Sequence, residues 1–303
     1  EHISLSFKKN NKTIKYDAPS TIDELSNILI NNTSTNIIAA GTDLSLEITQ
    51  SMKEFSHIVS VNKVIELKEI KDGANEIEIG AAVSYEDAAS CLISNWPDLA
   101  AFLQRFASLP IKNWATIGGN IANASPIGDM PPVLIALDAK LKLRKGADSR
   151  IINLEDFFIT YKKTVIQQGE FIESIIIPKP NGNQQLITHK MSKRYEDDIS
   201  AVCMAINISS KNNKPESFKI AFGGMSGIPQ RSKKLEDFLL KHWQNDDIAS
   251  LSYKVLNEEF SPFTDVRASS EYRLQVSANL VKKTILMYLG ESIENLAEYT
   301  HLN

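Results

Sequence analysis

The chain has 303 residues, of which 43% are apolar and 23% charged, and its formal net charge is −4. This balance is typical of a globular protein with a buried core, and it excludes an overall basic field that would attract nucleic acid. No apolar run approaches the roughly 18 residues that a membrane span needs.

The cysteines and the first residues indicate the compartment. Cys91 and Cys203 are too few for an Fe–S cluster or a four-cysteine zinc site, and we interpret both as buried thiols in a reducing compartment. The chain begins with EHISLSF, which is neither a signal segment nor a start at Met. We therefore expect a cytoplasmic protein, and a piece of a longer polypeptide.

The first half of the chain predicts alternating helices and strands. A helix is expected over Thr21–Ile30, because Thr21 and Glu24 have the spacing of a capping box and the apolar residues that follow share one face. The other expected elements of this half are strands at Asn36–Ala40, His57–Asn62 and Glu76–Val83, and helices at Ser84–Trp96 and over 98–107.

The second half contains the predicted domain boundary, the Pro-, Gly- and Asn-rich stretch Lys179–Gln185. Strands are expected before it over 139–144 and 171–178, and after it as an antiparallel sheet over 186–191, 199–209 and 217–224. The remainder predicts helices, the last with an apolar stripe of Leu274, Ala278, Val281, Ile285 and Leu289. The pattern indicates an α+β fold, with two lobes before the boundary and a smaller domain of sheet and helices after it.

Two glycine-containing segments are candidate anion sites. In IIAAGTDLS, Ile37–Ser45, small residues follow a strand, so successive backbone N–H groups can line one concavity. The simpler interpretation is a strand-to-helix turn capped by Thr42. In TIGGN, Thr116–Asn120, paired glycines permit positive φ and close approach of a ligand, and the nearby hydroxyl and amide groups are neutral hydrogen-bonding partners. The simpler interpretation there is a strained loop before a helix that starts near Met130.

Taken together, the two segments favour a dinucleotide. Neither contains Lys or Arg, so phosphates would be held by backbone dipoles, and a pyrophosphate held along its length suits two such loops. The motifs G-x-x-x-x-G-K-[ST], G-x-G-x-x-G, H-E-x-x-H and C-x-x-C do not occur in the sequence, and the five histidines lack metal-ligand spacing. We therefore predict no metal site.

Five segments also resemble a known family. They are AAGTDLSLE, ASLPIKNWATIGGNIANASPIGDMPPVLIALDAKLKL, MSKRYEDDISAV, AFGGMSGIPQRS and RASSEYR. In this order they resemble the FAD-binding portion of xanthine dehydrogenase-like molybdenum hydroxylases, which is related to the medium flavoprotein subunit of carbon monoxide dehydrogenase. The resemblance implies a two-lobed FAD-binding domain of the vanillyl-alcohol-oxidase (PCMH) type over 1–178. It also implies a C-terminal domain of the carbon monoxide dehydrogenase flavoprotein type over 185–303.

The resemblance implies a set of residues that contact FAD. Its first loop wraps the pyrophosphate, an aromatic residue lies beside the flavin ring, and a lysine lies near the flavin. On this chain the positions are Ile37, Ile38, Ala39, Ala40, Gly41, Thr42, Asp43, Leu44, Phe106, Thr116, Ile117, Gly118, Gly119, Asn120, Asn123, Asp129, Ile172 and Lys190. From local chemistry alone, Phe106 and Ile172 are core positions and Asp129 is a helix N-cap. No catalytic residue is indicated.

The resemblance also implies an electron relay. Electrons from a molybdopterin centre would pass through [2Fe–2S] clusters, both on partner domains or subunits, to FAD and on to NAD+ or another acceptor. The acidic run Glu196–Asp198 would modulate the flavin, or it is a solvated turn. Two alternatives stay open. One is a flavoprotein subunit acting in oxidation of carbon monoxide, an aromatic acyl-CoA or another heterocycle, and the other is a non-catalytic module that retains the fold.

Overall fold

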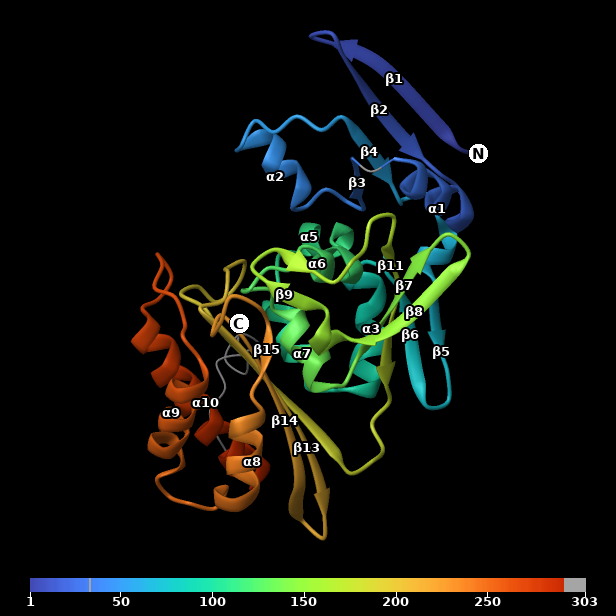
Figure 1. The fold of residues 1–303 in the computed structure, drawn as a ribbon. Helices are drawn as coiled ribbons and strands as arrows, with labels where there is room; N and C mark the ends of the chain where they lie inside the picture. Colours follow the sequence, from blue (N-terminus) through green and yellow to red (C-terminus); the bar gives the residue numbers. More distant parts are fainter. Residues whose placement is uncertain (33, 292–303) are drawn as a thin grey trace, which may run out of the picture. The chain divides into compact units, whose positions relative to one another are not determined.

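The structure is a computed structural model that describes residues 1–32 and 34–291. Its helices and strands confirm the α+β class (Figure 1). The chain forms two compact units, each built from three segments. The first unit comprises Glu1–Cys91, Ser108–Ala124 and Asp138–Lys179, and the second comprises Leu92–Ala107, Ser125–Leu137 and the chain from Pro180 onward.

The first unit begins with a four-stranded sheet in the order β1-β2-β4-β3. Strands β1 (Ile3–Lys9) and β2 (Lys12–Ala18) form an antiparallel hairpin. Its two-residue turn, Asn10-Asn11, has φ values of 50° and 62°, the left-handed conformation that matches the twist of a hairpin. Strands β3 (Thr35–Ile38) and β4 (His57–Ser60) continue the sheet in parallel to β2.

Helix α1 (Ile22–Asn31) packs its apolar face on this sheet and is capped as expected. Thr21 Oγ1 accepts from the Glu24 N–H at 3.2 Å. The Glu24 carboxylate accepts from the Ser20 N–H at 2.7 Å, one residue earlier than a capping box requires. The cap therefore fixes both the start of α1 and the chain that enters it.

A second, five-stranded antiparallel sheet completes the first unit, in the order β5-β6-β11-β7-β8. Its strands are β5 (Ile70–Asp72), β6 (Glu76–Gly80), β7 (Lys140–Lys145), β8 (Asp148–Asn153) and β11 (Phe171–Pro178). The shorter elements of this region are η1 (Ile65–Lys68), η2 (Leu154–Asp156), β9 (Phe158–Thr160) and β10 (Lys163–Thr164). Helix α3 (Tyr85–Asn95) starts at the predicted Ser84–Asp87 cap and passes from the first unit into the second.

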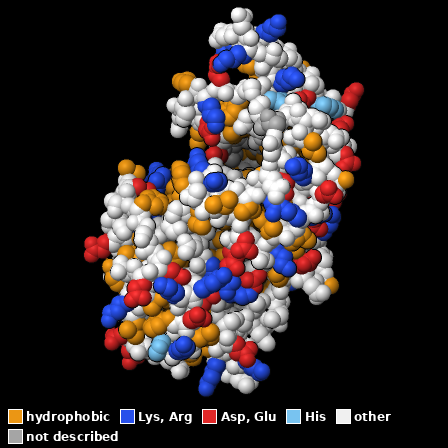
Figure 2. Space-filling view, viewed as in Figure 1, with side chains coloured by type: hydrophobic (Ala, Val, Ile, Leu, Met, Phe, Trp, Pro, Cys, Tyr) orange, Lys and Arg blue, Asp and Glu red, His pale blue; other side chains and the backbone are white. Residues whose placement is uncertain are grey.

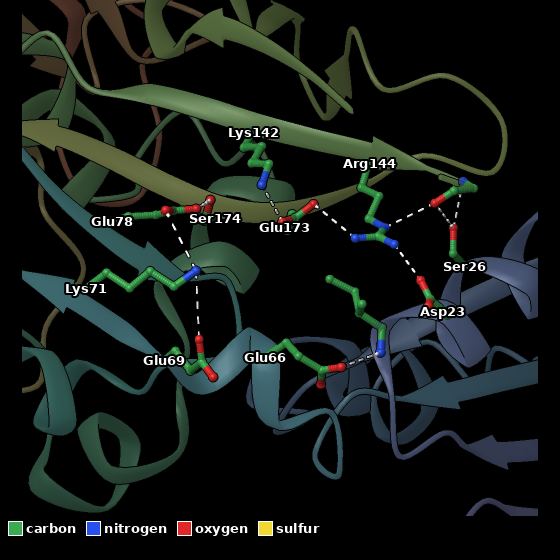
Figure 3. Close-up of polar contacts among 12 residues, drawn as sticks. Asp23, Ser26, Glu66, Glu69, Lys71, Glu78, Lys142, Arg144, Glu173 and Ser174 are labelled. Carbon is green, nitrogen blue, oxygen red and sulfur yellow. Dashed lines mark hydrogen bonds and ion pairs between the residues drawn. The ribbon is translucent and has the colours of Figure 1, made fainter. Parts of the chain in front are cut away.

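Polar contacts join α1 to the second sheet (Figure 3). Arg144 of β7 binds Asp23 of α1, and the Gly146 N–H donates to Ser26 Oγ at 2.7 Å. Glu66 of η1 accepts from the Ile22 N–H at 3.2 Å. The two sheets of the first unit are thus held through the N-terminal half of α1.

The second unit is a four-stranded antiparallel sheet covered by helices, as predicted for the region after the boundary. Its strands are β12 (Gln184–Met191), β13 (Val202–Lys211), β14 (Lys214–Gly223) and β15 (Gln230–Arg231). Its helices are α4 (Leu99–Arg105), α7 (Met130–Ala136), α8 (Lys233–His242), α9 (Ile248–Glu259) and α10 (Ser270–Tyr288).

Two expectations about individual residues need correction. Leu274, Ala278, Val281 and Ile285 are buried on α10, but Leu289 lies at its C-cap and is 51% exposed, because the helix ends before that position can face the core. Cys203 is buried, whereas Cys91 is only partly buried on α3.

No helix in the described part of the chain has the length and apolar character to cross a membrane.

Candidate functional site

The first candidate loop connects β3 to the short helix α2 (Leu44–Thr49). Gly41 has a φ of +75°, and a Cβ there would lie 3.2 Å from Ile38 Cδ1, so the turn requires glycine. Asp43 occupies the N-cap position, not Thr42, and its side chain makes no capping hydrogen bond. The N–H groups of Gly41, Thr42 and Asp43 find no acceptor among the described residues. The loop therefore presents unused backbone donors.

The second candidate loop is the start of a helix, α6 (Ile117–Ala122), preceded by α5 (Leu109–Trp114). Thr116 is its N-cap, and Thr116 Oγ1 accepts from the Gly119 N–H at 3.0 Å. The Ile117 and Gly118 N–H groups donate to the Val83 and Ala81 carbonyls, both at 3.1 Å. The chain after β6 thus takes up two donors of the helix start and fixes its direction.

The paired glycines do not have the expected positive φ, because both lie within α6. A Cβ on Gly118 would lie 2.5 Å from both the Cβ and the carbonyl oxygen of Ala81. Gly118 is buried and permits this close packing. Gly119 is exposed, and within the described part of the chain a Cβ on it would come close only to Thr116 Oγ1. Gly119 alone is therefore available for the close ligand approach that the sequence predicted for both.

Asn120 holds an unpartnered polar atom. Its Oδ1 is buried and has no hydrogen-bond partner among the described residues. Burying an amide oxygen without a partner costs about 1–3 kcal/mol. Asn123, the C-cap of α6, is partly exposed, and Ala124 after it has a φ of +49°, which ends the helix. Asn120 therefore lacks a donor that a bound molecule could provide.

Ile172 lies in β11 opposite Leu143 of β7 and is 6% exposed, so its core interpretation from local chemistry agrees with its burial.

In the second unit, the structure brings Asp129 and Lys190 together. Lys190 Nζ of β12 donates to Asp129 Oδ2 at 2.6 Å, to the Asp198 carbonyl at 2.7 Å and to Ser200 Oγ at 2.9 Å. The two side chains are 2% and 9% exposed. Asp129 is the N-cap of α7, the position that its local chemistry predicted, but its carboxylate makes no capping bond there and instead accepts from Lys190. Asp129 Oδ1 is buried and without a partner among the described residues.

Phe106 is 8% exposed, ends α4 and stacks on Phe102 with ring centroids 6.4 Å apart. Its neighbour Arg105 was not indicated by the sequence. The Arg105 guanidinium donates to the Lys190 carbonyl, to the Tyr195 carbonyl and to Ser192 Oγ, and lies 5.0 Å from the Tyr195 ring centroid. Ser200 was likewise missed. The sequence feature that could have indicated Arg105 is a cation at the end of an apolar helix. No sequence feature indicated Ser200.

The acidic run after β12 is anchored at its last residue. The Asp198 carboxylate accepts from the Arg194 N–H at 2.8 Å, and this contact lowers the pKa of Asp198 below its usual range. Asp197 has a φ of +50°. The run is therefore a defined turn, tied to Lys190 through the Asp198 carbonyl.

Comparisons with known proteins show the family of this chain. Residues 11–180 match the model of the FAD binding domain in molybdopterin dehydrogenase, and residues 187–288 match that of the CO dehydrogenase flavoprotein C-terminal domain. The glyceraldehyde dehydrogenase medium chain of Sulfolobus acidocaldarius is 30% identical over 88% of this chain and 95% of that protein. The xanthine dehydrogenase of Drosophila subobscura is 27% identical over 77% of this chain, which spans only 19% of that protein.

The fold also matches a solved structure of carbon monoxide dehydrogenase from Hydrogenophaga pseudoflava. The TM-score is 0.82 at 21% identity, and the match covers 88% of this chain and 94% of that one. The first family model covers more than half of the chain, and the second follows it in the expected order. The chain therefore belongs to the family of FAD-binding domains of molybdopterin dehydrogenases, and is the FAD-binding component of an oxidoreductase of the molybdenum hydroxylase class.

Proposed function

We propose that this chain binds FAD through the eighteen residues named above. It would relay electrons from [2Fe–2S] clusters on partner chains or domains to FAD and on to NAD+ or another acceptor. The observation that carries the proposal is the buried, unpartnered Oδ1 of Asn120 beside the exposed Gly119. A hydroxyl or amino group of a dinucleotide would donate to this oxygen, and the open surface at Gly119 would let it approach. These features fit FAD.

In this proposal, the residues of the first unit bind and orient the cofactor. The free N–H groups from Gly41 to Asp43 suit the pyrophosphate. Backbone N–H dipoles that point at a phosphate can bind it without the help of Lys or Arg. Thr116 holds the start of α6 by accepting from the Gly119 N–H, and this contact fixes the helix that carries Asn120. A helix start fixed in this way would lower the ordering cost of binding.

In the second unit, Asp129 and Lys190 supply a fixed charge pair. Lys190 Nζ donates to Asp129, to Ser200 and to the Asp198 carbonyl, so all three of its donors are used. This leaves Asp129 Oδ1 as an acceptor for a hydroxyl of the cofactor. When bound, FAD accepts electrons singly and delivers two as a hydride, which suits it to join Fe–S clusters to NAD+. The protein positions the cofactor and sets its electrostatics.

Asn120→Ala tests the binding site. It removes the unpartnered acceptor, so we expect flavin affinity to fall at least tenfold, a change of about 1.4 kcal/mol. The free energy of unfolding of the flavin-free protein should stay unchanged or rise by about 1 kcal/mol, because a buried unpaired oxygen disappears. Asn153→Ala, on β8 with its amide bound to Asp156, is the matched control and should retain flavin. Equal flavin retention by both variants would contradict the assignment.

The acceptor is tested separately. The flavin-loaded chain, reduced photochemically, should form NADH when mixed with NAD+. If an artificial acceptor but not NAD+ reoxidises the flavin, the result would favour the flavoprotein subunit of another molybdenum hydroxylase. Assays of the purified complex with carbon monoxide, an aromatic acyl-CoA and heterocycles would then distinguish between the candidate substrates. A colourless protein that cannot be reconstituted with FAD would favour the non-catalytic module.

A further inference from the structure

Strand β1 exposes an apolar row that the cofactor site does not use. Ile3, Leu5 and Phe7 alternate along the strand and are 40%, 57% and 56% exposed. All seven residues of β1 are exposed. Their register partners on β2, Ala18, Tyr16 and Ile14, lie on the same face of the hairpin, and the last two are only partly buried. The hairpin thus has one apolar face that reaches solvent.

The backbone of β1 is also available. β1 is an edge strand, and β2 is its only neighbour in the sheet among the residues that the structure describes (Figure 1). Its pairing with β2 is regular over seven residues, with no bulge and no proline to interrupt it. Proteins usually protect such an edge with charges, bulges or proline. Residues 3–7 of this strand, ISLSF, carry none of these.

The charges at the tip of the hairpin indicate what pairs with this edge. Lys8, Lys9, Lys12 and Lys15 are all exposed, whereas the only exposed carboxylate within residues 1–18 is Glu1, because Asp17 is buried. Only Lys9 has a carboxylate within ion-pair distance among the described residues, Glu54 at 3.1 Å. Elsewhere, on the face shown in Figure 2, Lys and Arg side chains are interspersed with Asp and Glu side chains. The hairpin is therefore locally basic on a chain whose net charge is −4.

We propose that β1 is the docking edge for an extended segment of another part of the same enzyme, which adds as a fifth strand to this sheet. Backbone hydrogen bonds would give affinity, and alternate side chains would give specificity. The segment would place apolar side chains beside Ile3, Leu5 and Phe7 and acidic side chains beside Lys8 and Lys9. This inference rests on the proposed function, because that function requires partners that carry the Fe–S clusters and the molybdopterin.

The test uses the enzyme co-expressed with its Fe–S and molybdopterin partners. Hydrogen exchange of residues 3–9 should be at least tenfold slower in the assembled enzyme than in the isolated chain. The double variant Leu5→Ser/Phe7→Ser should retain at least tenfold less of the partners than wild type while keeping its flavin. Ile151→Ser, on β8 with the same 57% exposure as Leu5, is the matched control and should retain them.

Several results would overturn the proposal. These are unchanged exchange of residues 3–9 on assembly, full partner retention by the double variant, or a concentration-dependent dimer of the isolated chain that the double variant abolishes. Binding of the isolated chain to phosphatidylcholine–phosphatidylserine vesicles through Leu5 and Phe7 would assign the face to a membrane instead. Flavin content tests the proposed function separately. A wild-type protein without flavin would contradict cofactor binding, but it would not bear on whether β1 binds a partner segment.

Discussion

At the scale of single residues, the ion pair of Lys190 and Asp129 joins positions 61 residues apart in the sequence. The sequence indicated both residues only through the family resemblance, because local chemistry predicts an N-cap and a strand residue. Asn120 could be named as polar, but its missing hydrogen-bond partner depends on the neighbours that the fold supplies. Side-chain identity was thus readable from the sequence, and side-chain pairing was not.

Lys190→Met should strongly destabilise the second unit, because the buried Asp129 carboxylate would lose its cation. The expected loss in free energy of unfolding is about 3–5 kcal/mol, measured by urea denaturation. Lys190→Met combined with Asp129→Leu should recover most of this loss, since no buried charge remains, yet flavin should not bind. A double variant as unstable as the single one would show that the pair itself is not the cause.

His189, next to Lys190, gives a pH-dependent prediction. Burial, helped by the charge of Lys283, lowers the pKa of His189 from 6.5 to about 3, and its Nε2 lies 2.9 Å from Thr284 Oγ1. The unfolded chain therefore binds a proton below pH 6.5 that the folded protein does not bind until about pH 3. The free energy of unfolding should fall with decreasing pH across this window, by up to about 1.4 kcal/mol per pH unit. In His189→Gln this pH-dependent loss of stability should be absent. Parallel profiles of the free energy of unfolding against pH for the two proteins would contradict the prediction.

At the scale of elements, helix-capping residues and the alternation of apolar and polar residues predicted most of the helices and strands. The caps of α1 and α3 and the strands of the second unit follow from local patterns. The β1–β2 hairpin and α6 were not predicted. The hairpin turns on Asn10-Asn11 without glycine, and α6 contains two glycines, which disfavour helix formation. Its formation depends on Ala81 and Val83, far away in the sequence, so the local pattern could only indicate a loop.

Gly118→Ala tests the packing of α6. The added Cβ would overlap the Ala81 carbonyl, so α6 must shift, and we expect a loss of about 1–3 kcal/mol in the free energy of unfolding together with weaker flavin binding. Gly227→Ala is the control, because a Cβ there meets no atom within 4 Å and its φ is not positive. Thermal unfolding followed by circular dichroism measures both. Equal midpoints would show that α6 does not need a glycine at this contact.

At the scale of the whole molecule, the order of residues along the chain differs from their grouping in space. The proposed domains, 1–178 and 185–303, are continuous, and the matched family models end and begin near the same boundary. The last twelve residues of the second lie outside the described residues. The compact units, however, are interleaved, and 92–107 and 125–137 belong with the later part of the chain. Sequence patterns find boundaries by composition, and composition does not record such long-range grouping.

A fragment that ends at Lys179 should therefore fold poorly. All seven residues of α7 are buried, and α7 packs on β13 and β14, which this fragment lacks. We expect the fragment to bind a hydrophobic dye and to retain less flavin than the full chain, measured by fluorescence and absorbance. A fragment with a sharp thermal transition and full flavin content would contradict this expectation.

The interleaving has a consequence for synthesis on the ribosome. The chain crosses between the units at residues 91, 107, 124, 137 and 179, so α4 and α7 emerge long before the strands that cover them. The first unit has all its segments once Lys179 has left the exit tunnel, but it then carries two apolar helices that wait for the second unit. The burial of Asp129 comes later still, because Lys190, its partner, lies on β12 after the last crossing.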